Sequence, residues 1–166
     1  MRLFKLLALP ALMLMPLSAN ASPTLKGSFG DWTVYSRYDG AQRLCYVVAH
    51  AKSKSPASVR HGDIHFLVAN WKSGIAFEQP SFMADFSLKA DRPPSVQIDG
   101  QKFPMYVSKN ESFIAERSDE VSLINRMRAG STMKVSAVSG RGTNVSYTFS
   151  LNGITAALER AQSDCN

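Results

Sequence analysis

Hydrophobic and polar residues alternate along most of the chain with a period of two, which is the pattern of strands that bury one face. Residues 144–151 show this most clearly, since every second position is apolar: Val145, Tyr147, Phe149 and Leu151. Residues 132–137 alternate in the same way, and Gly140-Arg141-Gly142 lies between the two segments. The two segments are therefore predicted to form a β-hairpin.

The same alternation predicts strands over most of the remaining chain. They are expected at residues 31–37, 44–50, 64–71, 83–88, 96–98 and 103–107, with a short strand at 113–115. Asp99-Gly100 separates two of these segments and is a strong signal for a hairpin turn. Polar, Pro-containing stretches between the other strands are expected to be loops.

Two segments have helical rather than strand spacing. The first helix is predicted at residues 119–129, with Ser118 as its N-cap and Gly130 at its end. Its apolar stripe consists of Leu123, Ile124 and Met127. The second helix is predicted to follow Asn152 as N-cap, and its stripe continues as far as Cys165. The earlier members of that stripe are Ile154, Ala157, Leu158 and Ala161.

Many short strands and only two short helices favour a mainly β fold. We expect an antiparallel β-sandwich with two short α-helices, formed as a single domain over residues 22–166. A chain of this length can bury a normal hydrophobic core without dense cross-linking. No repeat and no long linker divides it.

Residues 1–21 have the features of a secretory signal peptide. Arg2 and Lys5 precede a mainly apolar stretch, and the small residues Ala19 and Ala21 suit a signal peptidase. A membrane anchor is the alternative, but this stretch is shorter than the roughly 20 apolar residues that span a bilayer. We therefore expect export, with cleavage after Ala21.

The net charge is mildly basic and excludes few classes of binding partner. The whole chain carries +6, and without the two basic residues of the signal segment 17 Lys and Arg face 13 Asp and Glu, which gives +4. Such a surface is compatible with an anionic lipid, polysaccharide or nucleic acid, but an ordinary solvated surface is favoured. Nucleic acid is not expected, because the chain is exported and lacks a clustered basic and aromatic face.

Cys45 and Cys165 are the only cysteines. Two cysteines in an exported protein most often pair, so a disulfide is predicted. The closed loop would hold 121 residues, and the chain-entropy model assigns about 4–5 kcal/mol to a loop of this size. A metal or redox role has little support, because the chain has no Cys-x-x-Cys motif and no cysteine–histidine cluster.

A basic loop after the second predicted strand is the first candidate binding element. It carries Lys52, Lys54, Arg60 and His61, which could meet a phosphate or an acidic partner. A solvated loop is the favoured alternative.

An aromatic surface is the second candidate, since Trp and Tyr residues concentrate in the early strands. We select Tyr35, Tyr38 and Trp71 as side chains that could lie exposed and bind a ligand or partner. Burial in the core of the sandwich is the favoured alternative for aromatic residues in strands.

Catalysis and metal binding have weak support. Asp63 and His65 share a predicted strand face and could join a serine in a hydrolase site, but no Gly-x-Ser-x-Gly motif is present. His61 and His65 are four residues apart, which in a strand separates their Cα atoms by about 13 Å and suits one metal ion poorly. We expect no catalytic residues, no metal and no cofactor.

Several segments in order resemble the invasion-associated locus B family. The similarity covers nearly all of residues 22–166, and it is specific through the ordered set rather than through one motif. The segments are Gly30-Asp31-Trp32-Thr33-Val34-Tyr35, Cys45-Tyr46, Arg60-His61-Gly62-Asp63, Ile98-Asp99-Gly100-Gln101-Lys102-Phe103, Met127-Arg128-Ala129-Gly130-Ser131-Thr132-Met133 and Phe149-Ser150-Leu151-Asn152-Gly153-Ile154-Thr155-Ala156-Ala157-Leu158.

The resemblance implies a small exported protein of Gram-negative bacteria, located in the periplasm, associated with the outer membrane or secreted. No catalytic residue and no cofactor come with the family. Better-known members are expected to carry further cysteines where this chain has Ser36 and Ser112-Phe113, so their disulfides cannot form here. The pairing of Cys45 with Cys165 therefore depends on parity and geometry.

The main functional hypothesis is an exported, non-enzymatic binding or interaction protein of the bacterial envelope, with a possible link to host-cell invasion or colonisation. Its partner would be a protein or an envelope component such as a lipid or glycan. One alternative is a periplasmic hydrolase of unknown substrate. Another is a structural or stress-related periplasmic protein without a small ligand.

Overall fold

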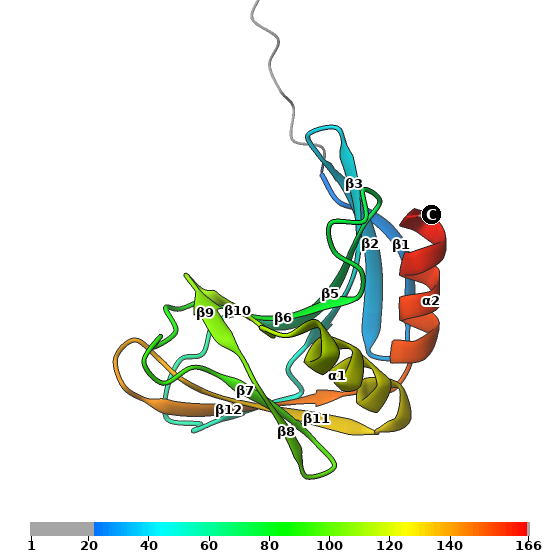
Figure 1. Cartoon of the computed structure of the whole chain (residues 1–166). Helices are drawn as coiled ribbons and strands as arrows, with labels where there is room; N and C mark the ends of the chain where they lie inside the picture. Colours follow the sequence, from blue (N-terminus) through cyan, green and yellow to red (C-terminus); the bar gives the residue numbers. More distant parts are fainter. Residues whose placement is uncertain (1–21, 166) are drawn as a thin grey trace, which may run out of the picture.

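The computed structural model describes residues 22–165, which form two antiparallel sheets packed together and two helices (Figure 1). This confirms the predicted mainly β sandwich with two short helices. The expected signal segment, residues 1–21, lies outside the described residues.

The larger sheet has seven strands. In spatial order they are β1 (Thr24–Phe29), β2 (Trp32–Asp39), β3 (Gln42–His50), β5 (Ile64–Trp71), β6 (Gln79–Ala84), β10 (Glu111–Phe113) and β9 (Tyr106–Ser108). The first four strands pair with their neighbours along most of their length. The smaller sheet has five strands, in the order β4 (Ser53–Ser55), β12 (Asn144–Ser150), β11 (Thr132–Val138), β7 (Ser95–Ile98) and β8 (Gln101–Pro104).

The larger sheet is strongly bent. In Figure 1, β1, β2, β3 and β5 form an upright arm, and β6, β10 and β9 turn across towards the smaller sheet. Helix α2 (Ile154–Cys165) packs along the outer side of the arm against β1, β2, β3 and β5. Helix α1 (Arg117–Ala129) lies beside β6 and α2. The helices and the smaller sheet therefore cover one face of the bent sheet, which we call the covered face.

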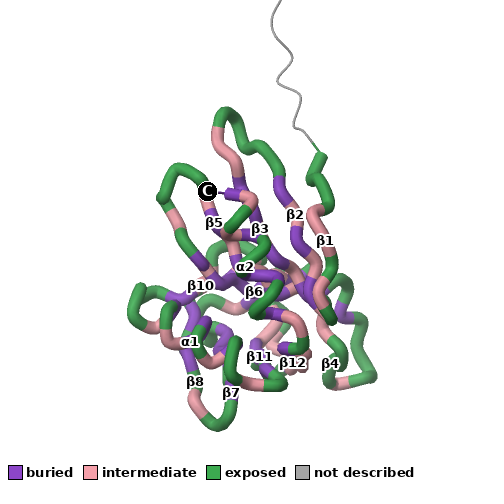
Figure 2. Tube along the Cα trace, turned by 90° about the vertical axis from the view of Figure 1, so that its right-hand side faces the viewer, coloured by how far each residue is buried: buried purple, intermediate pink, exposed green. Residues whose placement is uncertain are grey.

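The hydrophobic core lies on the covered face. Its largest fully buried side chains include rings from both sheets, and two ring contacts join the layers: Phe66 meets Phe149 with centroids 5.9 Å apart, and Phe82 meets Tyr147 at 5.6 Å. Figure 2 shows buried residues concentrated in the strands and exposed residues in the connecting turns. The alternation of the strands predicted this layer correctly, because burial follows every second residue.

A disulfide fastens α2 to this layer. Cys165, the last residue of the helix, is joined to Cys45 in β3, with their Cα atoms 5.8 Å apart. Both residues are buried. The predicted pairing is confirmed, and it ties down an end of the chain that would otherwise fray.

The start of α2 depends on a close approach between two turns. The amide of Asp31 donates to the carbonyl of Asn152 over 3.0 Å. Gly153 has φ +88°, and a Cβ there would lie 2.1 Å from the carbonyl oxygen of Phe29. Gly153, and not the predicted Asn152, directly precedes the helix, and its carbonyl accepts from Ala157. The predicted N-cap is therefore wrong by one residue.

Helix α1 also begins earlier than predicted. Glu116 is the N-cap residue, in extended conformation and without a side-chain cap, so Ser118 lies inside the helix and not at its cap. The carbonyl of Glu116 accepts hydrogen bonds from the amides of Asp119 and Glu120, which fixes the first turn. The predicted end at Gly130 is confirmed, since its amide donates to the carbonyl of Arg126.

The strand predicted at residues 83–88 is misplaced. The observed strand β6 starts at Gln79 and ends at Ala84, and Leu88 makes only an isolated bridge with Ser139. The alternation of residues 84–88 continues past the point where pairing stops. Pro80 concealed the true start, but it is tolerated because β10 pairs only with residues 81–83, which leaves Pro80 one neighbouring strand.

Three further differences concern strands. Neither β1 nor the short β4 was predicted; β4 falls within the basic loop that was expected after the second predicted strand, and it pairs with β12. The single strand expected at residues 103–107 is divided into β8 and β9 by Met105, whose amide donates to the carbonyl of Pro94. The strand expected at 113–115 is β10, shifted to begin at Glu111.

Candidate functional site: the concave face of the larger sheet

The face of the larger sheet opposite the core is the candidate site, and we call it the concave face. Strand β5 shows how the two faces separate: its core positions are at most 3% exposed, whereas the positions between them are partly exposed. The core positions are Ile64, Phe66, Val68 and Asn70, and the others are His65, Leu67, Ala69 and Trp71. In Figure 1 the inner side of the bend carries no helix or strand from the described residues.

The register of the strands arranges the concave face in rows that cross the sheet. The row at one end consists of Arg37, Leu44 and Trp71. The next consists of Tyr35, Tyr46, Ala69 and Gln79, and the third of Val48, Leu67, Ser81 and Phe113. The row at the other end consists of His50, His65, Met83 and Glu111. All these residues line one hollow with a volume of about 580 Å³.

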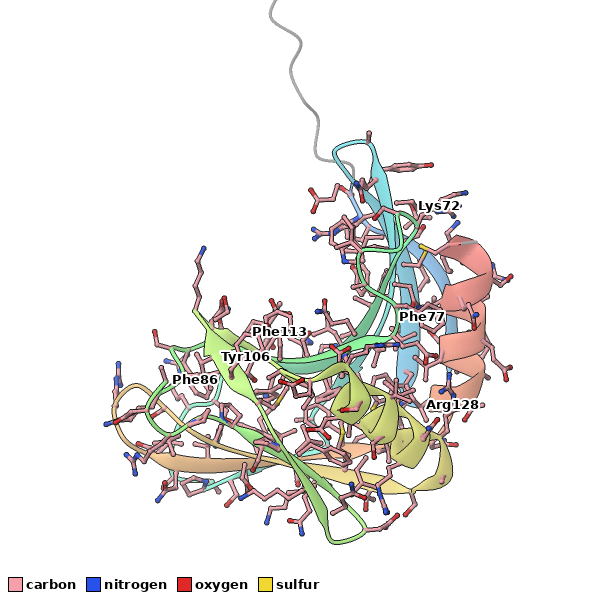
Figure 3. The ribbon with its side chains drawn as sticks, in the orientation of Figure 1. Lys72, Phe77, Phe86, Tyr106, Phe113 and Arg128 are labelled. Atoms are coloured by element: carbon pink, nitrogen blue, oxygen red, sulfur yellow. A yellow bond between two sulfur atoms is a disulfide. The ribbon has the colours of Figure 1, made fainter. Side chains whose placement is uncertain are left out.

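The middle of the concave face is aromatic and aliphatic. Tyr35 and Tyr46 stack with ring centroids 5.7 Å apart, and burial raises the pKa of Tyr46 above its usual value. Tyr106 meets Phe113 at 5.8 Å beside the hollow, and Tyr106 is 49% exposed. Figure 3 shows Tyr106 and Phe113 next to each other at the β9–β10 end of the sheet. The middle of the hollow is therefore mainly apolar, and the charged side chains that line it, Arg37 and Glu111, lie in its two end rows.

The histidine row forms one end of the hollow. The rings of His50 and His65 meet edge to face with centroids 4.5 Å apart. Burial lowers the pKa of His65, and the neighbouring His50 lowers it further. The carboxylates of Asp63 and Asp85 act in the opposite direction but are weaker than these effects. Nδ1 of His65 is buried and has no hydrogen-bond partner.

The structure brings together two of the three predicted aromatic residues. Tyr35 and Trp71 both line the concave face. Tyr38 is 58% exposed and lies elsewhere, against a separate hollow beside the turn that follows β2. The prediction that these aromatic residues bind a partner stays a prediction.

The basic loop does not gather its four predicted side chains at one point. Lys52 pairs with Asp31, which lowers the pKa of that carboxyl, and Nζ of Lys54 donates to the carbonyl of Gly62. His61 is 9% exposed and lies 3.0 Å from the hydroxyl of Tyr147. Arg60 remains exposed. Binding of an anion by this loop therefore stays a prediction without a shared cluster of cations.

The residues considered for catalysis and metal binding are not brought together either. His65 lines the concave hollow, whereas Asp63 is not among the lining residues and influences His65 only as a nearby charge. His61 and His65 point to different surroundings, since His61 is held by Tyr147 and Pro56. Within residues 22–165, no group of three or more His, Cys, Asp or Glu side chains is placed to hold a metal ion.

Sequence reasoning missed most of the concave face, including Tyr46, Val48, Leu67 and Phe113. A signal was present, because residues 44–49 and 66–69 contain apolar residues at consecutive positions, so both faces of each strand are apolar. A strand of a sandwich that needs only one buried face does not require this. No helix among the described residues is long and apolar enough to span a membrane.

Comparison with known proteins identifies the family. No curated protein and no solved structure matches the chain. The family model described as "Invasion associated locus B (IalB) protein" matches residues 32–162, from the first residue of β2 into the last turns of α2. This match covers most of the chain and both sheets, so the protein belongs to the invasion associated locus B (IalB) family.

Proposed function

We propose that this protein is an exported, non-enzymatic interaction protein of the bacterial envelope, and that it binds its partner on the concave face. The observation that carries the proposal is the hollow of about 580 Å³ on that face, lined by Tyr46, Leu67, Trp71 and Phe113 and left uncovered by the described chain.

The energetics of the face favour an interaction surface. Exposed apolar area costs about 25 cal/mol for each Å² left in water, so covering the partly exposed apolar side chains of the hollow would be favourable. Concave hollows lined mainly by apolar and aromatic side chains, with a few polar groups, are the usual form of binding sites. Tyr and Trp are enriched at such interfaces, because each offers a rigid ring together with one polar atom.

The compartment is supported by the disulfide and by the family. A buried disulfide that closes most of the domain persists in an oxidising compartment such as the periplasm. The predicted signal peptide and the family name agree with a role in the envelope, with invasion of host cells as one context. In this proposal the disulfide fastens α2 to the covered face, and the concave face binds the partner.

Site-specific photo-crosslinking in the living bacterium tests the proposal. A photoreactive amino acid is placed at position 67, in the middle of the concave face, and in a second strain at position 136. Ser136 is an exposed strand residue of the smaller sheet and lines none of the hollows described above, so it is a matched control.

We expect irradiation to produce a discrete crosslinked product from position 67 and none from position 136. The same product should form from position 46. Products of equal yield from all positions, or none from positions 46 and 67, would show that the concave face is not the binding surface. A crosslink to a macromolecular partner shifts the band on a denaturing gel, and a crosslink to a lipid shifts the intact mass of the protein.

A further inference from the structure

We propose that His50, His65 and Met83 form a binding site for one Cu(I) ion at the end of the concave face. The site is a second function of the protein and does not depend on the partner proposed above. No sequence motif announces it, since the three residues lie on three different strands and 33 positions separate the first from the last.

Strand register places the three candidate ligands side by side. His50 in β3 is the direct partner of His65 in β5, and His65 is in turn the direct partner of Met83 in β6. Directly opposed residues of an antiparallel sheet have Cβ atoms about 4.5–5.5 Å apart and point to the same side. The three side chains therefore stand in one line on one face, and all three line the same hollow.

The two imidazole donors lie close together, and one of their nitrogen atoms has no partner. The two imidazole rings are already together, with centroids 4.5 Å apart, so little reorganisation is needed to direct one nitrogen from each at a shared ion. Nδ1 of His65 is buried and bonds to no other group, which is costly for a polar atom. A metal ion could bind this nitrogen, which the fold otherwise leaves without a partner. It could also bind the other nitrogen of His65 after the ring turns.

The types of donor atom indicate which metal the site would bind. Imidazole nitrogens accept zinc, copper, nickel and iron, but a thioether is a soft ligand that favours Cu(I). The set of two imidazoles and one thioether is neutral, so a monovalent ion leaves less uncompensated positive charge among the ligands than a divalent ion would. His50 is exposed and Met83 is partly exposed, so an ion can enter from solvent.

Charged groups around the row do not oppose this assignment. Glu111 follows Met83 in the same row and adds a negative charge at its end. Asp63 and Asp85 act on His65 as negative charges, and Lys54 acts as a positive one. The nearby carboxylates therefore outnumber the nearby ammonium group, which favours a cation at this end of the hollow.

The test is a competition titration of the exported protein, purified from the periplasm without an affinity tag. Cu(I) is supplied as its acetonitrile complex under anaerobic conditions without a thiol, so that the Cys45–Cys165 disulfide stays closed. Bicinchoninate serves as the coloured competitor. Four proteins are compared: the wild type, His65→Gln, Met83→Leu and Met133→Leu. Met133 is a buried methionine of the smaller sheet and provides the matched control.

We expect the wild type to take one equivalent of Cu(I) and Met133→Leu to behave identically. Substitution of residues that hydrogen-bond to metal ligands lowers metal affinity about 10–100-fold. Loss of a direct donor in His65→Gln or Met83→Leu should therefore weaken Cu(I) binding at least about tenfold. Circular dichroism of each variant checks that the fold is retained. No uptake by the wild type, or equal affinities for Met83→Leu and Met133→Leu, would overturn the proposal.

Discussion

The covered and concave faces of the larger sheet are made by the same strands and differ in what lies over them. In β5, Phe66 is fully buried and its ring meets Phe149 of the smaller sheet, while its neighbour Leu67 lines the open hollow. Both faces are largely apolar, so polarity alone does not distinguish them. One layer of hydrophobic residues therefore builds the fold, and the second layer is available for binding.

The largest expected effect comes from releasing the element that covers the core. In the Cys45→Ala/Cys165→Ala double variant, α2 is no longer tied to β3, and the chain-entropy model predicts a loss of about 4–5 kcal/mol in the free energy of unfolding. Urea unfolding without reductant measures it. A loss of less than about 1 kcal/mol would mean that packing of α2 alone holds the covered face.

Adjacent substitutions in β5 compare the two faces directly. Phe66→Ala removes a ring that packs on Phe149, and we expect it to cost about 3–5 kcal/mol. Leu67→Ala on the concave face should cost about 1 kcal/mol or less, because its side chain is already partly exposed. Urea midpoints of the two variants give the answer. Equal costs would show that the concave face is part of the core.

A smaller effect is expected for a hydrogen-bonded pair of polar side chains at the covered face. Tyr147 is fully buried, and its hydroxyl bonds to Nδ1 of His61 over 3.0 Å; burial raises the pKa of Tyr147 to about 12. Tyr147→Phe leaves the imidazole nitrogen without this partner and should cost about 1–2 kcal/mol. A variant as stable as the wild type at neutral pH would show that this bond contributes nothing.

The smallest effect is the pH dependence contributed by the concave face. Because the pKa of folded His65 is lowered, the unfolded chain binds a proton there more readily than the folded chain. The free energy of unfolding should therefore fall as the pH drops through the unfolded value of 6.5. His65→Gln should flatten this fall between about pH 7.5 and pH 5. An unchanged slope in that variant would contradict the assignment to His65.

The sequence predicted the covered layer well, because burial imposes a period of two on the strands that build it. The alternation in residues 144–151 and 64–71 located β12 and β5, and Cys165 on the stripe of α2 led to the correct disulfide. Errors arose where pairing and not polarity decides the structure. Pro80 lies in a strand because one side needs no amide there, and Met105 interrupts a strand through one hydrogen bond to Pro94.

The concave face was largely hidden from sequence reasoning for a different physical reason. Its rows are made by register across β2, β3, β5, β6 and β10, and residues far apart in the chain become neighbours only when those registers are known. His65 was compared with His61, four residues before it, whereas its actual ring neighbour is His50 on the adjacent strand. Consecutive apolar residues such as Val47 and Val48 were the available hint that both faces matter.

We propose that the concave face binds the partner while the covered face maintains the fold. The most direct measurement is the amount of the crosslink-identified partner captured from envelope extract by immobilised Leu67→Glu, compared with wild type and with Ser136→Glu at equal folded fraction. We expect capture to fall at least about tenfold for Leu67→Glu, as for loss of a residue central to an interface, and to stay unchanged for Ser136→Glu. Equal capture by all three proteins would contradict binding on the concave face.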